Sequence, residues 1–289
     1  MGDKTGIEWT DATWNPIVGC KAVSDGCDNC YAARMSSGRL SNIPEYQGLA
    51  RDGRFTGEVR VIKDRFDQPL RWKRPRKIFV NSMSDLFHPD VPDDARREIF
   101  DIMAKADWHV FQVLTKRPQI MQHWVTEYYG GSRPLTNVWL GASIENDSYT
   151  FRADHLRATP AAIRFLSLEP LLGPVTGLDL QGIDWVIVGG ESGPNARPMH
   201  PNWVREIRDT CMTAKVPFLF KQWGEHAPEA QVEVSASMST GYLGYCGEWS
   251  GPHARIWGGG GPRPVVMAKV GKRKAGRLLD GEIWDQYPK

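Results

Sequence analysis

The run KIFVNS, residues 77–82, is the first of six short apolar segments that decide the fold of this chain. Continuous apolar runs of this length are typical of strands that are buried on both faces, as in a parallel sheet. The other five runs are WHVFQVLT (108–115), NVWLGAS (137–143), AIRFLSLE (162–169), DWVIVGG (184–190) and VPFLFKQ (216–222).

Helix-like segments lie between these predicted strands. Segment 92–106 begins with Pro92 and acidic residues and has Ile99 and Phe100 among its apolar positions, and segment 200–214 has a similar pattern. Alternation of strands and helices predicts βαβ units and an α/β fold. We therefore expect a partial TIM-like (β/α) barrel, with a doubly wound open sheet as the alternative.

The pattern breaks after residue 224. Residues 225–264 include VSASMSTGYLGYCGEWSGPHARIWGGGGPRP, whose Gly and Ser content predicts a long irregular insertion or lid. The last residues predict a short strand, a basic turn and a closing segment. We expect a barrel domain over 1–224, which includes the cysteine loop at the amino end, and an irregular C-terminal extension over 225–289.

Polar side chains follow each predicted strand. In a parallel barrel the carboxyl ends of the strands share one face, where active sites form, so we expect these residues to meet there. Lys116 and Arg117 could bind a carboxylate or phosphate or form a surface salt bridge. The glutamates could bind ribose hydroxyls or an ammonium group, transfer protons, or pair with Lys116 and Lys221. The candidates at the strand ends are Ser82, Ser84, Asp85, Thr115, Lys116, Ser143, Glu145, Glu169 and Glu191.

Three of the five cysteines lie on one short loop, in the run GCKAVSDGCDNCYA (19–32). Three thiolates so close together suit a soft metal or an iron–sulfur cluster, and three protein ligands leave one position open for a substrate or cofactor. The predicted ligands are Cys20, Cys27 and Cys30. The alternative is a structural zinc site whose fourth ligand is His88, His200 or Cys246.

The bulk composition is that of an ordinary globular protein, with 41% hydrophobic and 24% charged residues among 289. An odd cysteine count with a tight cluster indicates a reducing compartment rather than a disulfide framework. The N-terminus has no apolar signal core, and no run approaches the roughly 18 apolar residues of a membrane span. We expect a cytoplasmic protein that does not associate with membranes.

The net charge of +2 does not by itself indicate a nucleic-acid partner, but the charge is uneven. Basic stretches over 71–77 and 269–277 could attract a phosphate backbone, or be an ordinary solvated surface. Trp139 and Trp185 lie in predicted strands and are expected in the core. Six other tryptophans near the site loops or basic stretches are candidates for stacking on bases, namely Trp9, Trp14, Trp72, Trp223, Trp249 and Trp257.

A series of motifs along the whole chain resembles a family of phage-type proteins with an N-terminal three-cysteine motif. The motifs are WNPIVGCKAVSDGCDNCYA, FVNSMSDLFHPDVP, FQVLTKRP, SLEPLLGP, VIVGGESGPNARPM, FKQWG and GRLLDGEIWDQYP. That family is similar in turn to radical S-adenosylmethionine (SAM) enzymes, in particular spore photoproduct lyase. The resemblance implies a partial barrel and a [4Fe-4S] cluster with SAM on the fourth iron. An electron from the cluster would cleave SAM to a 5′-deoxyadenosyl radical.

Carried over to this chain, the resemblance gives roles to the candidate residues. Cys20, Cys27 and Cys30 match the cluster ligands, although the first gap is six residues where radical SAM enzymes usually have three. Asn29 stands where an aromatic residue usually precedes the third cysteine, and Tyr31 follows it. The positions that match SAM contacts are Ser82, Ser84 and Asp85 for the methionine part, Thr115 and Lys116 as a Thr-Lys pair, and Ser143 and Glu145 near the ribose.

The resulting expectation is a radical SAM enzyme that repairs or modifies a nucleic-acid base, with DNA favoured and with a flavodoxin or ferredoxin as electron donor. Lys116 is a candidate catalytic residue and Cys246 a candidate hydrogen donor, whereas Cys211 lies in a helix-like run and is expected in the core. The alternatives are a non-catalytic zinc-containing nucleic-acid-binding protein and a radical SAM enzyme with a small-molecule or peptide substrate.

Overall fold

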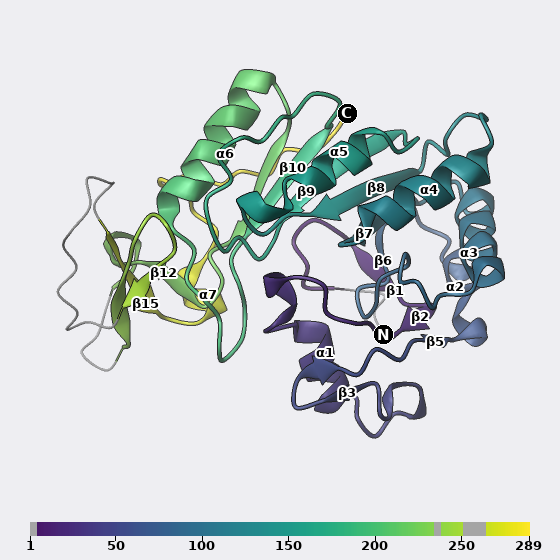
Figure 1. The fold of residues 1–289 in the computed structure, drawn as a ribbon, viewed down its shortest axis with the longest axis horizontal. Helices are drawn as coiled ribbons and strands as arrows, with labels where there is room; N and C mark the ends of the chain where they lie inside the picture. The colour runs from purple at the N-terminus through teal and green to yellow at the C-terminus, as the bar shows by residue number, and fades with distance from the viewer. Residues whose placement is uncertain (1–4, 234–237, 251–263) are drawn as a thin grey trace. The chain divides into compact units, whose positions relative to one another are not determined.

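The central element of the fold is a parallel sheet of seven strands (Figure 1). The computed structural model describes residues 5–233, 238–250 and 264–289. The strands follow one another in the order β1-β6-β7-β8-β9-β10-β11, with no reversal of direction along the sheet. A doubly wound sheet has a switch point where the order reverses. The fold is therefore the predicted partial TIM-like barrel and not the doubly wound alternative.

Each of the six predicted apolar runs contains one strand of this sheet, and a further strand precedes the cysteine loop. The strands are β1 Ala12–Trp14, β6 Lys77–Val80, β7 Val110–Thr115, β8 Val138–Ser143, β9 Ile163–Leu168, β10 Trp185–Gly189 and β11 Phe218–Gln222. The predicted boundaries differ by up to two residues, because the apolar run marks burial and not where the ladder of hydrogen bonds begins and ends.

The chain divides into two compact units, which are described separately. Unit 1 comprises residues 1–143 and 151–166, and unit 2 comprises residues 144–150 and 167–289. In unit 1 the strands pair in parallel, with Trp14 opposite Val80, Val80 opposite Val113, and Thr115 opposite Ala142. This register brings the carboxyl ends of β6 and β7 to the same edge of the sheet.

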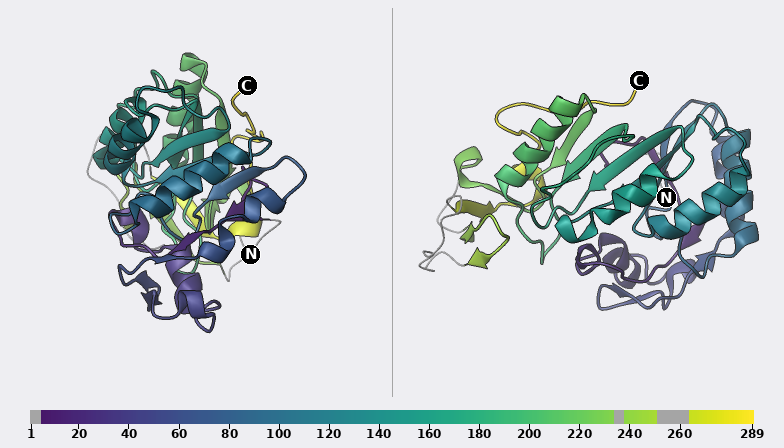
Figure 2. Two further views of the ribbon diagram at one scale, coloured as in Figure 1. Left: turned by 90° about the vertical axis from the view of Figure 1, so that its right-hand side faces the viewer. Right: turned by 45° about the horizontal axis from the view of Figure 1, so that its top comes forward.

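Helices of unit 1 lie along its strands (Figures 1 and 2). The predicted helix over 92–106 is α3, Asp93–Lys105, which has two aspartates in its first turn and buries Ile99 and Phe100. The other helices of the unit are α1 Tyr31–Ser37, α2 Gln68–Arg71, α4 Pro118–Tyr129 and α5 Phe151–Arg157. Its short strands are β2 Ile17–Val18, β3 Ala50–Arg51, β4 Arg54–Phe55 and β5 Arg60–Val61.

Unit 2 contains β10 and β11, which pair in parallel, and the predicted second helix as α6, Pro201–Ala214. The described part of the glycine-rich extension forms a small antiparallel sheet in the order β12-β15-β13-β14 rather than irregular structure. Cross-strand pairing stabilises these strands despite their glycines. The elements are β12 His226–Pro228, β13 Thr240–Leu243, β14 Trp249–Ser250, β15 Val265–Lys269 and α7 Lys272–Ala275.

Most of the tryptophans that were predicted to stack on bases are buried, so that prediction is wrong for them. Trp9, Trp14, Trp72 and Trp223 are each at most 8% exposed and pack in the core, so they cannot stack on bases. Trp249 is 41% exposed, and Trp257 lies outside the described residues. Proximity in sequence to a basic stretch did not distinguish a surface aromatic from a core one, because large aromatics bury the most apolar area.

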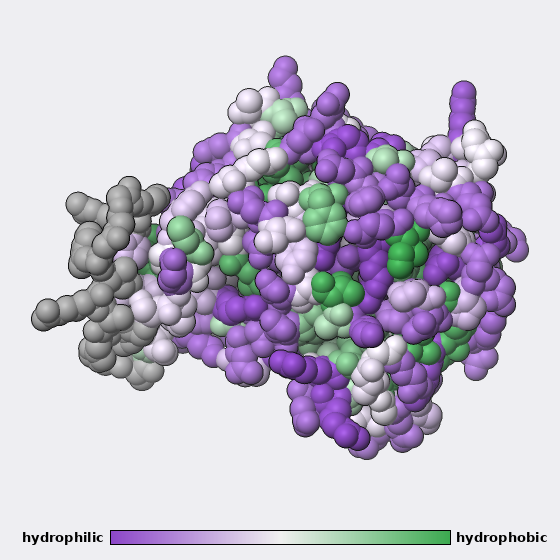
Figure 3. Space-filling model, in the orientation of Figure 1, coloured by the Kyte–Doolittle hydropathy of each residue, from purple (hydrophilic) through white to green (hydrophobic). Residues whose placement is uncertain are grey.

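Two observations concern membrane-spanning helices and the distribution of hydrophobic residues on the surface. Among the helices of the described residues, none has the length and apolar character needed to cross a membrane. On the face shown in Figure 3, hydrophilic residues predominate and hydrophobic ones form separate spots. Scattered spots of this kind are normal for a protein surface.

The contact between Gly141 and Phe165 gives a test of core packing in unit 1. A Cβ at Gly141 would lie 2.5 Å from the ring of Phe165, which is fully buried and would have to shift. We expect Gly141→Ala to lower the free energy of unfolding by about 1–3 kcal/mol through overpacking. Gly6→Ala is the matched control, because a Cβ there meets nothing within 4 Å. Urea denaturation of both variants makes the comparison, and equal midpoints would contradict the packing described.

Candidate metal centre and active site

The loop that bears the three cysteines is fastened to the residues that follow β6. The backbone N–H of Gly19 donates to the carbonyl of Met83 at 3.1 Å, and the hydroxyl of Tyr31 donates to the carbonyl of Ser82 at 2.6 Å. Gly19 has φ of +90°, and a Cβ there would lie 2.2 Å from the carbonyl oxygen of Glu58. Glycine is therefore required immediately before Cys20.

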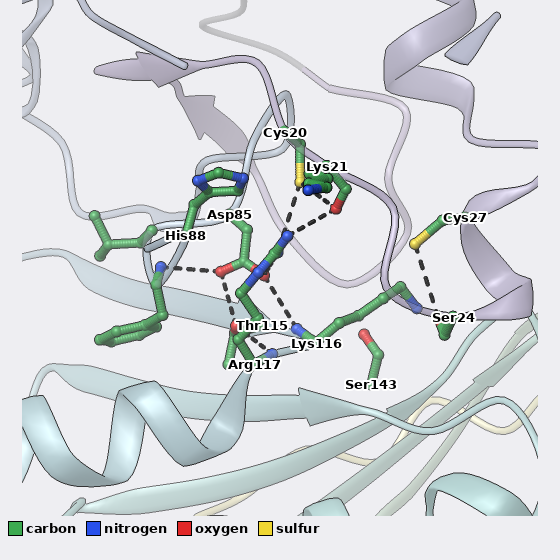
Figure 4. A network of polar contacts seen from close by, with 12 residues as sticks. Cys20, Lys21, Ser24, Cys27, Asp85, His88, Thr115, Lys116, Arg117 and Ser143 are labelled. Atoms are coloured by element: carbon green, nitrogen blue, oxygen red, sulfur yellow. Dashed lines mark hydrogen bonds and ion pairs between the residues drawn. The ribbon is translucent and has the colours of Figure 1, made fainter. Parts of the chain in front are cut away.

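All three cysteines of the loop are half-buried. Cys20 Sγ accepts from the Nη1 of Arg117 at 3.7 Å, and Cys27 Sγ lies 3.8 Å from the hydroxyl of Ser24 (Figure 4). Removal from water raises the pKa of the Cys20 thiol to about 12, with a further contribution from Asp85, and raises the pKa of Cys30 as well. Cys27 is close enough to contribute to both shifts.

Asp85 is the centre of a buried polar network that joins the ends of β6 and β7 (Figure 4). Its Oδ1 accepts from the hydroxyl of Thr115 at 2.7 Å and from the N–H of Phe87 at 2.9 Å. Its Oδ2 accepts from the N–H of Lys116 at 3.2 Å and from Nη1 of Arg117 at 2.8 Å. We call these five residues the Asp85 network. Four donors satisfy the carboxylate, which is what a buried anion requires.

Arg117 connects this network to the cysteine loop. Besides Asp85 and Cys20, its guanidinium donates through Nη2 to the carbonyl of Lys21 at 2.7 Å. The residue is 8% exposed. Burial lowers its pKa, but the charges of Asp85 and Cys20 outweigh that effect and raise the pKa above its ordinary value. Arg117 thus forms a buried ion pair, where the sequence analysis gave a surface salt bridge as the alternative to carboxylate or phosphate binding.

The chemistry of the three thiols fits an iron–sulfur cluster. Within the part of the chain that the structure describes, no three or more His, Cys, Asp or Glu side chains converge on a point that could hold a single metal ion. Thiolates are the usual ligands of iron–sulfur clusters, and Cys20, Cys27 and Cys30 supply three of them from one loop.

The serines predicted as cofactor contacts have structural partners in unit 1. Ser84 donates through its hydroxyl to the carbonyl of Ile17 at 2.9 Å, and Ser82 donates to Oδ1 of Asn15 at 3.2 Å. Ser143, at the end of β8, is buried, and its carbonyl accepts from Arg152 at 2.8 Å. These bonds fix the strand-end loops, and a role of these serines in binding SAM stays a prediction.

The remaining predicted residues belong to unit 2. Glu169 pairs with Lys221 at 2.6 Å, which is the pairing that the sequence analysis gave as an alternative for the glutamates. Glu191 instead pairs with Arg197 at 2.6 Å, and Glu145 is fully buried. Cys246 is exposed, whereas Cys211 is buried in the core as expected.

Sequence reasoning missed two residues that fasten the cysteine loop, Tyr31 and Asn15. The hydroxyl of Tyr31 reaches the loop after β6, and Oδ1 of Asn15 accepts from the N–H of Met83 at 2.9 Å. The position of Tyr31 directly after the third cysteine was a usable signal. Asn15 offered none, because its partner lies 68 residues away.

Two histidines considered as zinc ligands are buried, and each uses Nδ1 as a hydrogen-bond acceptor. His88 accepts from the N–H of Asp90 at 3.2 Å, and His200 accepts from the N–H of Asn202 at 3.1 Å at the start of α6. Among the residues that the structure describes, neither Nε2 atom has a hydrogen-bond partner. Burial lowers the pKa of His88, and lowers that of His200 to about 4.

Comparisons with known proteins place this arrangement in a family. The family model described as "Protein of unknown function (DUF5131)" matches residues 4–288. The sequence matches no curated protein. None of these findings supports the phage-type description that accompanied the sequence resemblance.

Two solved structures are similar to this chain. A cysteine-to-serine mutant of spore photoproduct lyase is 12% identical, with coverage of 97% of this chain and 74% of the lyase chain and a TM-score of 0.47. Spore photoproduct lyase complexed with dinucleoside spore photoproduct is 13% identical, with coverage of 92% and 70% and a TM-score of 0.42. Likenesses this distant do not transfer an activity.

The Asp85–Arg117 pair gives a stability prediction. We expect Asp85→Ala to lower the free energy of unfolding by about 3–5 kcal/mol, because it leaves the buried guanidinium without its counter-charge. Asp67→Ala is the matched control, since it breaks the exposed pair with Arg71 and should cost less than about 1 kcal/mol. Urea denaturation of both variants at pH 7.5 measures the difference, and similar losses would contradict the buried pair.

His200 and His226 give a pH prediction. Burial lowers the pKa of both from 6.5 to about 4. Between these values the unfolded chain binds protons that the native protein does not, so the free energy of unfolding falls as the pH decreases below 6.5. We expect a loss of about 2 kcal/mol per histidine between pH 7.5 and pH 5.

The variant His200→Asn separates this effect from other titrations. Asparagine keeps an acceptor for the first turn of α6 but does not titrate in this range. Urea midpoints at pH 7.5 and pH 5 should therefore differ less in His200→Asn than in the natural protein. An unchanged difference would show that His200 is not the buried neutral group described.

Proposed function

The chain belongs to the family described as "Protein of unknown function (DUF5131)". We propose that it is a radical SAM enzyme acting on a nucleic-acid base. One observation supports this most strongly. Three neighbouring thiols lie on a loop that is fastened, through Arg117 and the loop after β6, to the carboxyl ends of two parallel barrel strands. Active sites of (β/α) barrels form at that end of the strands.

The three cysteines would hold a [4Fe-4S] cluster and leave one iron open for the amino and carboxylate groups of SAM. When bound, such a cluster supplies the electron that cleaves SAM reductively. The chain's contribution is to keep the three thiolates together at a barrel edge that is partly screened from water. All three residues are half-buried, as that role requires.

Lys116 is the residue that we propose to contact SAM or substrate directly. Burial raises the pKa of the Cys30 thiol, and the positive charge of Lys116 acts against that shift, which supports an ammonium group within electrostatic reach of the cysteine loop. A cation there suits the carboxylate of SAM. Asp85 and Thr115 would support Lys116, because both are already bonded within the Asp85 network. Contacts to SAM are further proposed for Ser82, Ser84, Ser143, Glu145, Glu169 and Glu191.

The proposed substrate is nucleic acid, with DNA favoured. The basic stretch 71–77 remains at the surface, with Arg71, Lys73 and Arg74 exposed. It precedes β6, at the opposite end of that strand from Asp85. Charges so placed would bind the backbone of a long polyanion away from the reacting base. Exposed Cys246 would donate a hydrogen atom to the product radical, and a flavodoxin or ferredoxin in a reducing cytoplasm would supply electrons.

The test begins with protein purified without oxygen and reconstituted with iron and sulfide. We expect about four irons per chain and, with dithionite and SAM, release of 5′-deoxyadenosine. Alanine variants of Cys20, Cys27 and Cys30 should each lose cluster and cleavage while keeping the natural circular dichroism. Cys211→Ala is the matched control, because this cysteine is buried in the core of unit 2 and is not part of the cysteine loop, and it should keep both.

Nucleic-acid specificity is measured separately. Single-stranded and duplex DNA should bind with an affinity that decreases with added salt, and should stimulate SAM cleavage. Stoichiometric zinc without a brown chromophore or SAM turnover would contradict the enzyme. Cleavage that DNA and RNA leave unchanged, without salt-dependent binding, would contradict the substrate and indicate a small molecule or peptide.

A further inference from the structure

We propose that Arg117 is a positioning residue for the cluster, one that holds Cys20 in its ligand position and, together with Asp85, sets how easily the cluster accepts an electron. The inference rests on the proposed function, because it presupposes a cluster on the three cysteines. It assigns Arg117 a role other than the carboxylate or phosphate binding, or the surface salt bridge, that its position at a strand end indicated.

The geometry of the guanidinium supports the positioning role. Its Nη1 contacts both Asp85 Oδ2 at 2.8 Å and Cys20 Sγ at 3.7 Å, and its Nη2 donates to the carbonyl of Lys21 at 2.7 Å (Figure 4). One rigid planar group therefore joins a strand-end carboxylate to the side chain of a predicted ligand and to the backbone next to it. Lysine has a single nitrogen and cannot reproduce this fork.

The backbone of Arg117 is also held in place. The backbone N–H of Arg117 donates to the hydroxyl of Thr115 at 2.9 Å, and that hydroxyl donates in turn to Asp85. Pro118 follows as the first residue of α4, where its fixed φ suits the start of a helix. The side chain is thus held at both ends, and Cys20 is held before any cluster is present.

The charges support the electronic role. Arg117 and Asp85 are a cation and an anion of 9% and 7% side-chain exposure beside a predicted ligand sulfur. Buried charges are weakly screened, and reduction adds one negative charge to the cluster. The guanidinium should therefore favour reduction and the carboxylate oppose it. Hydrogen bonds to ligand sulfurs and net charge are known means of setting the potentials of such clusters.

The experiment compares reconstituted variants of the full chain without SAM. An EPR-monitored redox titration gives the midpoint potential, and a chelator gives the rate of iron release. We expect Arg117→Gln to lower the potential and to weaken iron retention about 10–100-fold. Asp85→Asn should raise the potential. Arg117→Lys, which keeps the charge but loses the fork, should keep a potential close to natural while it releases iron faster.

Arg96→Gln is the matched control. Arg96 is also a buried arginine of unit 1, 5% exposed, but it donates to the carbonyls of Leu86, His88 and Val91. We expect Arg96→Gln to lower stability without shifting the potential. Shifts of opposite sign in Arg117→Gln and Asp85→Asn would support the inference, because a purely structural role moves both variants the same way. If Arg117→Gln does not fold, Asp85→Asn and Arg117→Lys still make the comparison.

The possible failures are distinguishable. If the natural protein binds no iron, the proposed function fails and the inference fails with it. If the natural protein holds a cluster but Arg117→Gln matches Arg96→Gln in potential and iron release, the inference alone is overturned. The same holds if Asp85→Asn lowers the potential.

Discussion

The contact between Asp85 and Arg117 is the constraint on which the candidate site depends. A carboxylate and a guanidinium taken out of water are costly unless each is fully bonded. Four donors on Asp85 and three acceptors on Arg117 meet that requirement. Because the partners come from the end of β6, the end of β7 and the cysteine loop, satisfying the two charges fixes all three segments together.

This arrangement also determines where the three thiols lie and how far they are buried. The loop that bears them has little regular secondary structure. Hydrogen bonds from the N–H of Gly19 and the hydroxyl of Tyr31 hold it against the residues after β6. Half-burial raises the pKa of Cys20 and Cys30, which disfavours bare thiolates. Bound iron would reverse that preference, because a coordinating thiol is deprotonated by the metal. Half-burial would therefore keep the thiols protonated until a metal binds.

Surface charge and aromatic burial point to different conclusions about partners. The basic stretch 71–77 stays exposed, which agrees with a polyanionic partner, whereas Trp9, Trp14, Trp72 and Trp223 serve the core. Any stacking on bases would therefore require other side chains. Trp249 of unit 2 is one exposed aromatic residue that could stack in this way. The proposed binding of nucleic acid would therefore be dominated by contacts between basic side chains and the phosphate backbone, and would depend strongly on salt.

The sequence by itself determined the fold class, because uninterrupted apolar runs such as 184–190 suit a strand buried on both faces, and it marked the three cysteines through their spacing. The sequence placed Asp85, Thr115 and Lys116 at the ends of strands, but it did not show which hydrogen bonds they form. Only the tertiary structure decided that Arg117 is buried against Cys20, that Glu169 pairs with Lys221, and that four tryptophans are core. Periodicity reports local burial, whereas these partners lie tens of residues apart and meet only when the strands assemble.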